Sequence, residues 1–266
     1  MPMSLFVDLL ALPQWVAILL LVAIAVFFSI AGFLVVHRFI PTEVRRIHND
    51  VAGFVFATLG VTYGVLLAFV VLVVWEQFND AKVNVENESS VAMVLYKSVT
   101  VYPDEAVSRT MKESLLKYVR QSVEEQQPMS AEQSARSSSA ALIQLFALLE
   151  GVVPDSAHEQ ILYTQILQNL NELTKYRNLR QQAAHEELPS VIWIGVLVGA
   201  MITLGFTFLF GTENFWAHIV IMSLLAALIA IVIYVVIEMD HPMTGSVTIK
   251  FPHGYFRILE LAEAKP

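Results

Sequence analysis

The stretch VAGFVFATLGVTYGVLLAFVVLVVW, residues 51–75, contains no acidic residue, no basic residue and no histidine. It is longer than the ~20 apolar residues with which a helix crosses a hydrocarbon layer of ~30 Å. Three similar stretches, which lack Asp, Glu, Lys and Arg, lie at about 13–36, 190–212 and 214–237. Because no water is present in lipid to bond a bare backbone, each stretch is expected to be an α-helix.

These four stretches predict an all-α membrane protein. Two transmembrane hairpins flank a helical insert outside the membrane. We expect the first hairpin at 1–76, a helical and cytoplasmic domain at 77–189, the second hairpin at 190–238 and a tail at 239–266.

Composition excludes several classes of protein. The formal net charge is −8, and the charged residues lie outside the four stretches. An acidic chain is a poor partner for nucleic acid, which is bound through basic clusters. The sequence contains no cysteine, so disulfides and thiolate metal sites are ruled out. We expect no metal site and no cofactor.

The second apolar stretch carries one face far into the insert. Its positions recur at spacings of three and four, and no Pro or Gly occurs between Gly64 and Pro103. The sequence therefore predicts one helix that leaves the membrane without a break. The members of this face, called the stripe below, are Gly53, Ala57, Gly60, Gly64, Leu67, Val71, Val74, Phe78, Ala81, Val85, Glu88, Ala92, Leu95 and Val99.

The stripe supports two interpretations, and the sequence leaves both open. Small residues such as Gly60 and Gly64 allow two helix backbones to approach closely. Alternatively, the stripe lines a pore shared by several subunits, with a hydrophobic constriction that gates by dewetting. The candidate pore-lining residues are Gly60, Gly64, Leu67, Val71, Val74 and Phe78.

Three amphipathic helices are expected in the insert. They span about 104–127, about 131–149, and a segment that begins near Asp155 or Ser156, either of which is a plausible N-cap. A Gln-Gln-Pro turn at Pro128 separates the first two helices.

The chain beyond the fourth stretch begins with a turn. Pro242 and Gly245 are expected to form it, while Asp240 bonds backbone amides of that turn or an arginine of the insert. The alternation of Val247, Ile249 and Phe251 predicts a short strand after the turn.

The absence of charge within the four stretches bears on function. Proton-coupled carriers place Asp, Glu or His inside the membrane, and only His218 meets that description here. The chain also carries no recognisable catalytic motif, so we do not expect an enzyme.

Three segments resemble one family. They are YGVLLAFVVLVVWEQFNDAKVNVENESSVAMVLY at 63–96, RNLRQQAAHEELPSVIW at 177–193 with its Arg177 and Arg180, and EMDHPMTGSV at 238–247. Together they resemble the bestrophin-like 4239 domain family of membrane proteins. The family name implies a comparison with bestrophins, which are pentameric anion channels with four spans per subunit. In those channels the second span lines a hydrophobic neck.

The resemblance favours an oligomeric ion channel, possibly conducting anions, with a hydrophobic constriction on the second transmembrane helix. The alternative is a non-conducting scaffold or sensor whose helical insert binds a protein partner. For a channel, the expected partners are the lipid bilayer, further copies of this chain (five by family analogy) and small inorganic ions. The expected location is a bacterial inner membrane, with both termini in the cytoplasm.

Overall fold

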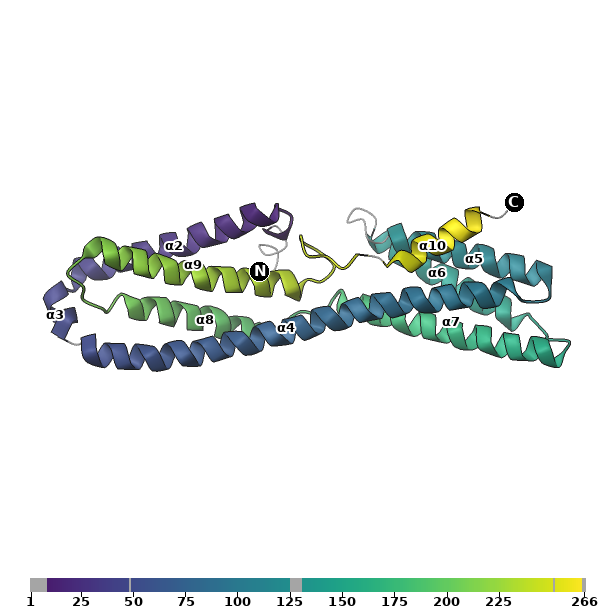
Figure 1. Cartoon of the computed structure of the whole chain (residues 1–266), viewed down its shortest axis with the longest axis horizontal. Coiled ribbons are helices and arrows are strands. Elements are labelled where there is room, and N and C mark those ends of the chain that lie inside the picture. Colours follow the sequence, from purple (N-terminus) through teal and green to yellow (C-terminus); the bar gives the residue numbers. More distant parts are fainter. Residues whose placement is uncertain (1–8, 48, 125–130, 251, 265–266) are drawn as a thin grey trace. The chain divides into compact units, whose positions relative to one another are not determined.

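The computed structural model describes residues 9–47, 49–124, 131–250 and 252–264, and of residues 131–137 only the backbone. Every regular element among these residues is an α-helix (Figure 1). The chain forms two compact units. The membrane unit comprises Met1–Phe78 and Glu186–Thr248, and the insert unit comprises Asn79–His185 and Ile249–Pro266.

Four helices of the described chain are long and apolar enough to cross a membrane, which confirms the predicted all-α fold with four spans. They are α2 (Gln14–Phe39), α4 (Asn49–Thr100), α8 (Ser190–Thr207) and α9 (Phe215–Asp240). A fifth and short helix, α3 (Thr42–Ile47), lies between α2 and α4 and was not predicted.

Helix α4 is continuous over 52 residues, as the absence of Pro and Gly after Gly64 predicted. Its residues up to Phe78 belong to the membrane unit and those from Asn79 onward to the insert unit. The helix ends at Thr100, just before Pro103. Asp104 then accepts bonds from the amides of Ala106 and Val107, at 2.8 and 3.0 Å, and so caps the next helix.

In the membrane unit, two glycines each lie directly against an aromatic ring from another segment. Tyr63 of α4 lies against Gly199 of α8, where an added Cβ would come within 2.6 Å of the ring. The Tyr63 hydroxyl donates to the Val196 carbonyl at 3.1 Å, so its polar end is satisfied inside the bundle. Gly32 of α2 receives the Phe208 ring in the same way, at 2.7 Å.

The connection between α8 and α9 explains why α8 ends at Thr207 rather than near residue 212. The Asn49 side chain donates to the Gly211 carbonyl at 2.8 Å and accepts from the Gly211 amide at 3.0 Å. Arg45 donates to the carbonyls of Phe208 and Phe210 at 3.0 and 3.4 Å. These side chains replace the helical partners of the backbone beyond Thr207.

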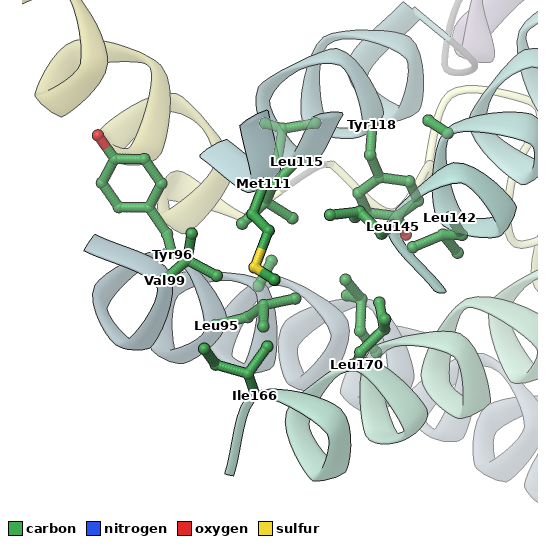
Figure 2. Packing of buried hydrophobic residues seen from close by; sticks show 14 of the residues in the cluster. Leu95, Tyr96, Val99, Met111, Leu115, Tyr118, Leu142, Leu145, Ile166 and Leu170 are labelled. Atoms are coloured by element: carbon green, nitrogen blue, oxygen red, sulfur yellow. The ribbon is translucent and has the colours of Figure 1, made fainter. Parts of the chain in front are cut away.

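The insert unit packs α5 (Glu105–Glu124), α6 (Ala131–Glu150), α7 (Ala157–Ala183) and the second part of α4 around one core. Figure 2 shows Leu95, Met111, Leu115, Leu145 and Leu170 within this core. Ser156 is the N-cap of α7 and accepts from the Glu159 amide, as one of the two predicted caps. The predicted turn at Pro128 lies outside the described residues.

The predicted strand at 247–251 was wrong for residues 247–250, which have no regular structure, and Phe251 lies outside the described residues. A strand needs a neighbour to bond its backbone, and the described chain contains no strand with which it could pair. A further helix, α10 (His253–Glu263), follows instead. Its Tyr255 and Ile258 are fully buried in the core of the insert unit, where α10 packs against α5.

Candidate functional site

The six candidate pore-lining residues occupy different environments on α4. Leu67 and Val74 are 8% and 0% exposed and belong to a hydrophobic cluster with residues of α8 and α9. Gly60, Val71 and Phe78 are half-buried, and Gly64 is exposed. Leu67 and Val74 are therefore largely covered by other residues of the subunit.

Four of these residues line a groove between α4 and α9. The groove has a volume of about 630 Å³, and its α4 wall includes Gly60, Gly64, Leu67 and Val71. Leu225, Leu228, Ile229 and Val232 of α9 form the facing wall. The lining is almost entirely apolar.

Gly60 and Gly64 do not bring two helices together inside the subunit. A Cβ built on either glycine would meet nothing within 4 Å, apart from its own helix. Among the glycines of the four spanning helices, the close approaches occur instead at Gly32 and Gly199, each against an aromatic ring. The interpretation of Gly60 and Gly64 as a packing surface would thus require a contact from outside the subunit.

A second face of α4 is exposed along the apolar stretch. Two threonines on it are satisfied within the helix, because Thr58 and Thr62 each donate to the carbonyl four residues earlier, at 3.3 and 2.9 Å. This open face therefore presents hydrocarbon and no unpaired hydroxyl from either threonine. Its large exposed side chains are Phe54, Val61, Val65, Phe69 and Leu72.

Two buried carboxylates organise the end of α9. Asp240 accepts from the Leu188 amide at 2.8 Å and from Trp193 Nε1 at 3.3 Å, so its partners lie at the start of α8. Neither expected partner of Asp240, an amide of the following turn or an arginine of the insert, is the one observed. Asp240 instead ties the entry of α8 to the exit of α9.

Glu238 has the role in the turn that was expected of Asp240. It accepts from Ser246 Oγ at 2.8 Å, from the Val247 amide at 3.2 Å and from the Tyr234 hydroxyl. Gly245 adopts a φ of +87°, which a residue with a Cβ rarely adopts. Pro242, three residues earlier, lies in the turn that follows α9.

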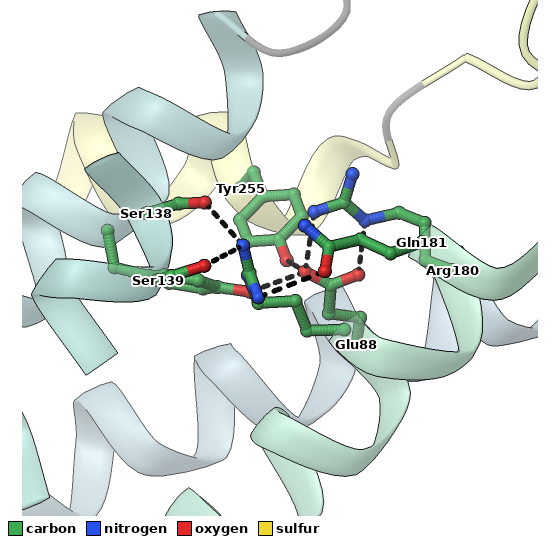
Figure 3. Close-up of polar contacts among 8 residues, drawn as sticks. Glu88, Ser138, Ser139, Arg180, Gln181 and Tyr255 are labelled. Atoms are coloured by element: carbon green, nitrogen blue, oxygen red, sulfur yellow. Dashed lines mark hydrogen bonds and ion pairs between the residues drawn. The ribbon is translucent and has the colours of Figure 1, made fainter. Parts of the chain in front are cut away.

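A buried carboxylate also lies at the centre of the insert unit (Figure 3). Glu88 of α4 is fully buried and pairs with Arg180 of α7, whose Nε lies 2.6 Å from Oε2. The hydroxyls of Tyr118 and Tyr255 donate to Oε1 at 2.5 and 2.8 Å. These four residues, here called the glutamate cluster, join α4, α5, α7 and α10.

Burial and the adjacent carboxylate determine the protonation of the two tyrosines. Burial raises the pKa of Tyr118 well above its ordinary value, and the charge on Glu88 raises it further. The pKa of Tyr255 is also raised well above its ordinary value, by burial first and then by Tyr118 and Glu88. Both phenols therefore remain neutral donors to Glu88.

Arg177, one turn before Arg180, bonds a different helix. Its Nη2 donates to Ser138 and Ser139 of α6 at 2.9 and 2.8 Å, and its Nη1 donates to Gln181 at 3.2 Å (Figure 3). The two arginines of the segment thus hold α7 to α6 and to α4 respectively. The sequence indicated both arginines as structural residues but did not predict the hydrogen-bond partners of either.

The family-model comparison decides the classification. The model of the Bestrophin-like domain matches residues 22–251 of the chain. The protein belongs to the Bestrophin-like family. Comparison with curated proteins finds no sequence match for this Bestrophin-like chain.

Solved structures share the Bestrophin-like fold at low sequence identity. A bacterial bestrophin homologue from Klebsiella pneumoniae has a TM-score of 0.65 and 11% identity, and the match covers 94% of this chain and 100% of that one. A leucine-to-threonine mutant of that homologue has a TM-score of 0.64 and 12% identity, with coverage of 92% and 98%. A membrane protein with a glycine-to-alanine substitution has a TM-score of 0.68 and 12% identity, with coverage of 94% and 100%.

The buried polar side chains described above form hydrogen bonds with the backbone and side chains of this Bestrophin-like chain itself. Asp240, Glu238 and Glu88 each accept bonds from neighbouring donors of the same unit. The described residues contain no group of three or more His, Asp or Glu side chains placed to hold a metal ion. In the described part of the membrane unit, α4 presents the apolar groove and the open apolar face.

Proposed function

We propose that this chain assembles into a ring of identical subunits in the membrane and conducts small ions, with α4 lining the pore. The observation that carries the proposal is the open face of α4, which is apolar, uncharged and exposed among the residues that the structure describes. A helix whose inward side is already packed against α8 and α9 has this face left for contact with lipid, a neighbouring copy or a water column. Membership in the Bestrophin-like family favours the third of these.

The mechanism we propose is a hydrophobic constriction. A narrow apolar pore loses its water column and closes, and a small widening or a polar substitution refills it. Leu67 and Val74 are enclosed within the subunit, so Val65 and Leu72 of the open face are better placed to form the constriction. Gly64, which is exposed, adjoins this face.

The finer properties rest on analogy with bestrophins. We propose small inorganic anions as the permeant ions and five subunits as the assembly. We place the protein in a bacterial inner membrane with both termini and the insert in the cytoplasm. The four spans support the lipid bilayer as its environment.

The proposal is tested by ion flux in liposomes with the purified full-length protein, whose subunit number is first measured by mass. Val65→Ser and Leu72→Ser are expected to raise anion flux about tenfold, since wetting a constriction removes its barrier. Ile221→Ser, at an exposed position on α9, is the matched control and should leave flux unchanged. A monomer, or an oligomer that passes no ion in any variant, would overturn the proposal.

A non-conducting scaffold or sensor is the second candidate, and one observation favours it. The insert unit has an open hollow of about 850 Å³ between α4 and α10, lined by Met93, Lys97, Phe256 and Arg257 among others. Such a mixed apolar and charged surface suits a protein partner better than an ion. Absence of flux, together with loss of a co-purifying protein in Phe256→Asp, would favour this function over the channel.

A further inference from the structure

The open apolar face of α4 is bounded by a carboxylate at each end. Glu76 follows Leu72 by four residues and Phe69 by seven, so it lies on the same face of the helix. Asp50 precedes Phe54 by four residues and lies at the other end of this face. At 1.5 Å per residue the two carboxylates are about 39 Å apart along the helix axis, which is more than the ~30 Å of the hydrocarbon layer.

The two carboxylates are exposed and keep their charge. No ion pair among the described residues includes Asp50 or Glu76. The stretch between them, residues 51–75, contains no acidic residue, no basic residue and no histidine. The open face therefore carries a negative charge at each end, and nothing along its length offsets that charge.

Basic residues of the membrane unit are confined to the end opposite Glu76. The segment Glu186–Thr248 of this unit contains neither lysine nor arginine. The basic residues of its other segment lie in the last turn of α2 or in α3, and they are Arg38, Arg45 and Arg46. The membrane unit thus places no lysine or arginine near Glu76.

Further acidic residues lie at the end of the membrane unit that carries Glu76. Val74 of α4 belongs to one hydrophobic cluster with Leu188, just before α8, and with Ile237 of α9. Glu187 precedes Leu188 in the sequence, and Glu238 follows Ile237. The formal charges that the membrane unit contributes to this end are therefore negative.

We propose that Glu76 is a selectivity-determining residue of the pore, where it favours the entry of cations and holds back anions. This role rests on the proposed function, a ring of identical subunits with α4 along the axis. In such a ring every copy places Glu76 at one level, and rings of Asp or Glu favour cations in channels. A negative mouth on a low-dielectric passage also raises the local concentration of cations.

Asp50 acts in the same direction at the other end of α4, but the arginines of α2 and α3 lie nearer to it and reduce its effect. Glu76 is therefore the stronger of the two determinants. It acts against the anion preference that the analogy with bestrophins suggests, and so sets how far this chain follows that analogy.

The plainer role of Glu76 is to mark where α4 leaves the bilayer, because a charged side chain is costly inside it. The two roles differ in what they predict. A carboxylate that only anchors the end of a span has no effect on which ion passes, whereas a ring of carboxylates at the mouth does.

The test measures the reversal potential of the purified full-length protein in a planar bilayer with a gradient of KCl across it, which gives the ratio of K⁺ to Cl⁻ permeability. Glu76→Gln removes the charge and keeps the shape, and should lower this ratio about fivefold. Glu76→Lys should lower it further. The effect of Glu76→Gln should fade in concentrated KCl, since the Debye length falls from about 10 Å at 0.1 M to about 3 Å at 1 M.

Two further variants complete the test. Asp50→Asn should lower the permeability ratio by a smaller factor than Glu76→Gln does. Glu172→Gln, at an exposed carboxylate of α7, is the matched control and should leave the ratio unchanged. The subunit number of each variant is measured by mass, so that a change of assembly is not mistaken for a change of selectivity.

Two kinds of failure are distinguishable. If the wild type conducts and neither Glu76→Gln nor Glu76→Lys changes the permeability ratio, the role of Glu76 is overturned while the channel stands. The role is also overturned if Glu172→Gln changes the ratio as much as Glu76→Gln does. If the wild type passes no ion, the proposed channel itself is overturned, and the role of Glu76 with it.

Discussion

Tyr255 donates a hydrogen bond of 2.8 Å to Glu88, although 167 positions separate the two residues. The bond fixes α10 to α4 inside the core of the insert unit. Beside it, an added Cβ on Gly254 would overlap the Ser89 hydroxyl, so the first turn of α10 lies directly on α4. The tail helix is therefore an integral part of that core.

Removing the Tyr255 hydroxyl should destabilise the insert unit. Tyr255→Phe keeps the ring but leaves Glu88 with one donor fewer, which costs roughly 1.5–3 kcal/mol for a bond to a charged group. The measurement is thermal unfolding of the full-length protein followed by circular dichroism. Tyr176→Phe, a half-buried tyrosine of α7 outside the glutamate cluster, is the control and should be nearly neutral. Equal midpoints for both variants would contradict a stabilising role for the bond.

The two tyrosines of the glutamate cluster predict a loss of stability at alkaline pH. Their pKa values are raised in the folded state above the ordinary value of 10.0, so folding favours the neutral phenol. Below about pH 10 both states are neutral and this stabilisation is fully present. Above it the unfolded chain loses protons that the folded chain retains, so the free energy of unfolding falls as pH rises.

The check is a series of unfolding midpoints between pH 7 and pH 11, with tyrosinate absorbance recorded in parallel. The wild-type midpoint should decline above about pH 10, and tyrosinate from the buried pair should form only as the protein unfolds. Tyr118→Phe should show a lower midpoint at neutral pH but a shallower alkaline decline. If the buried phenols ionise while the fold is intact, this account of their environment is wrong.

Gly211 should not tolerate a side chain. A Cβ there would lie 2.6 Å from the Arg46 nitrogen and 2.8 Å from the Thr42 carbonyl oxygen, and both are backbone atoms that cannot rotate away. Gly211→Ala is expected to destabilise the membrane unit by about 1–3 kcal/mol, the usual cost of overpacking. Gly195→Ala is the matched control on α8, since its Cβ would meet nothing within 4 Å. Alanine favours a helix interior over glycine, so the control should be neutral or slightly stabilising.

The proposed orientation of the chain in the membrane can be measured by cysteine labelling. The chain has no cysteine of its own, so only the introduced thiol can react. Val153→Cys places a thiol in the connection between α6 and α7, where residue 153 is 81% exposed. Glu213→Cys places one in the connection between α8 and α9. A membrane-impermeant maleimide should label Glu213→Cys in intact cells, and Val153→Cys only after the membrane is permeabilised. The reverse pattern would place the insert on the outside.

The sequence predicted the features that depend on local pattern. Four long uncharged stretches were enough for the spans, and the absence of Pro and Gly after Gly64 was enough for the length of α4. The stripe also predicted a face of α4 that is buried in the insert unit, where Ala81, Val85 and Leu95 are buried. What contacts a face cannot be read from its period, so the sequence alone did not show that Leu67 and Val74 pack in a cluster with residues of α8 and α9.

The glutamate cluster could not be predicted, because its bonds join residues 30, 92 and 167 positions apart. A signal for it was nevertheless present. Glu88 falls on an otherwise apolar stripe, and an acidic residue in such a place needs buried donors. Helix α10 was missed for a related reason, since 11 residues with Tyr255 and Ile258 on one face form a short pattern after a proline.

The order in which the donors to Glu88 occur along the chain has a consequence for biosynthesis. A ribosome delivers Tyr118 first, then Arg180, and Tyr255 only after both helices of the second hairpin. Chains fold from the N-terminus as they emerge, and contacts between distant segments form late. The insert unit therefore completes its core only after α8 and α9 have been synthesised. A chain that stalls or is cut between α9 and α10 would leave a buried carboxylate with one donor missing, and so present quality-control proteases with an incomplete fold.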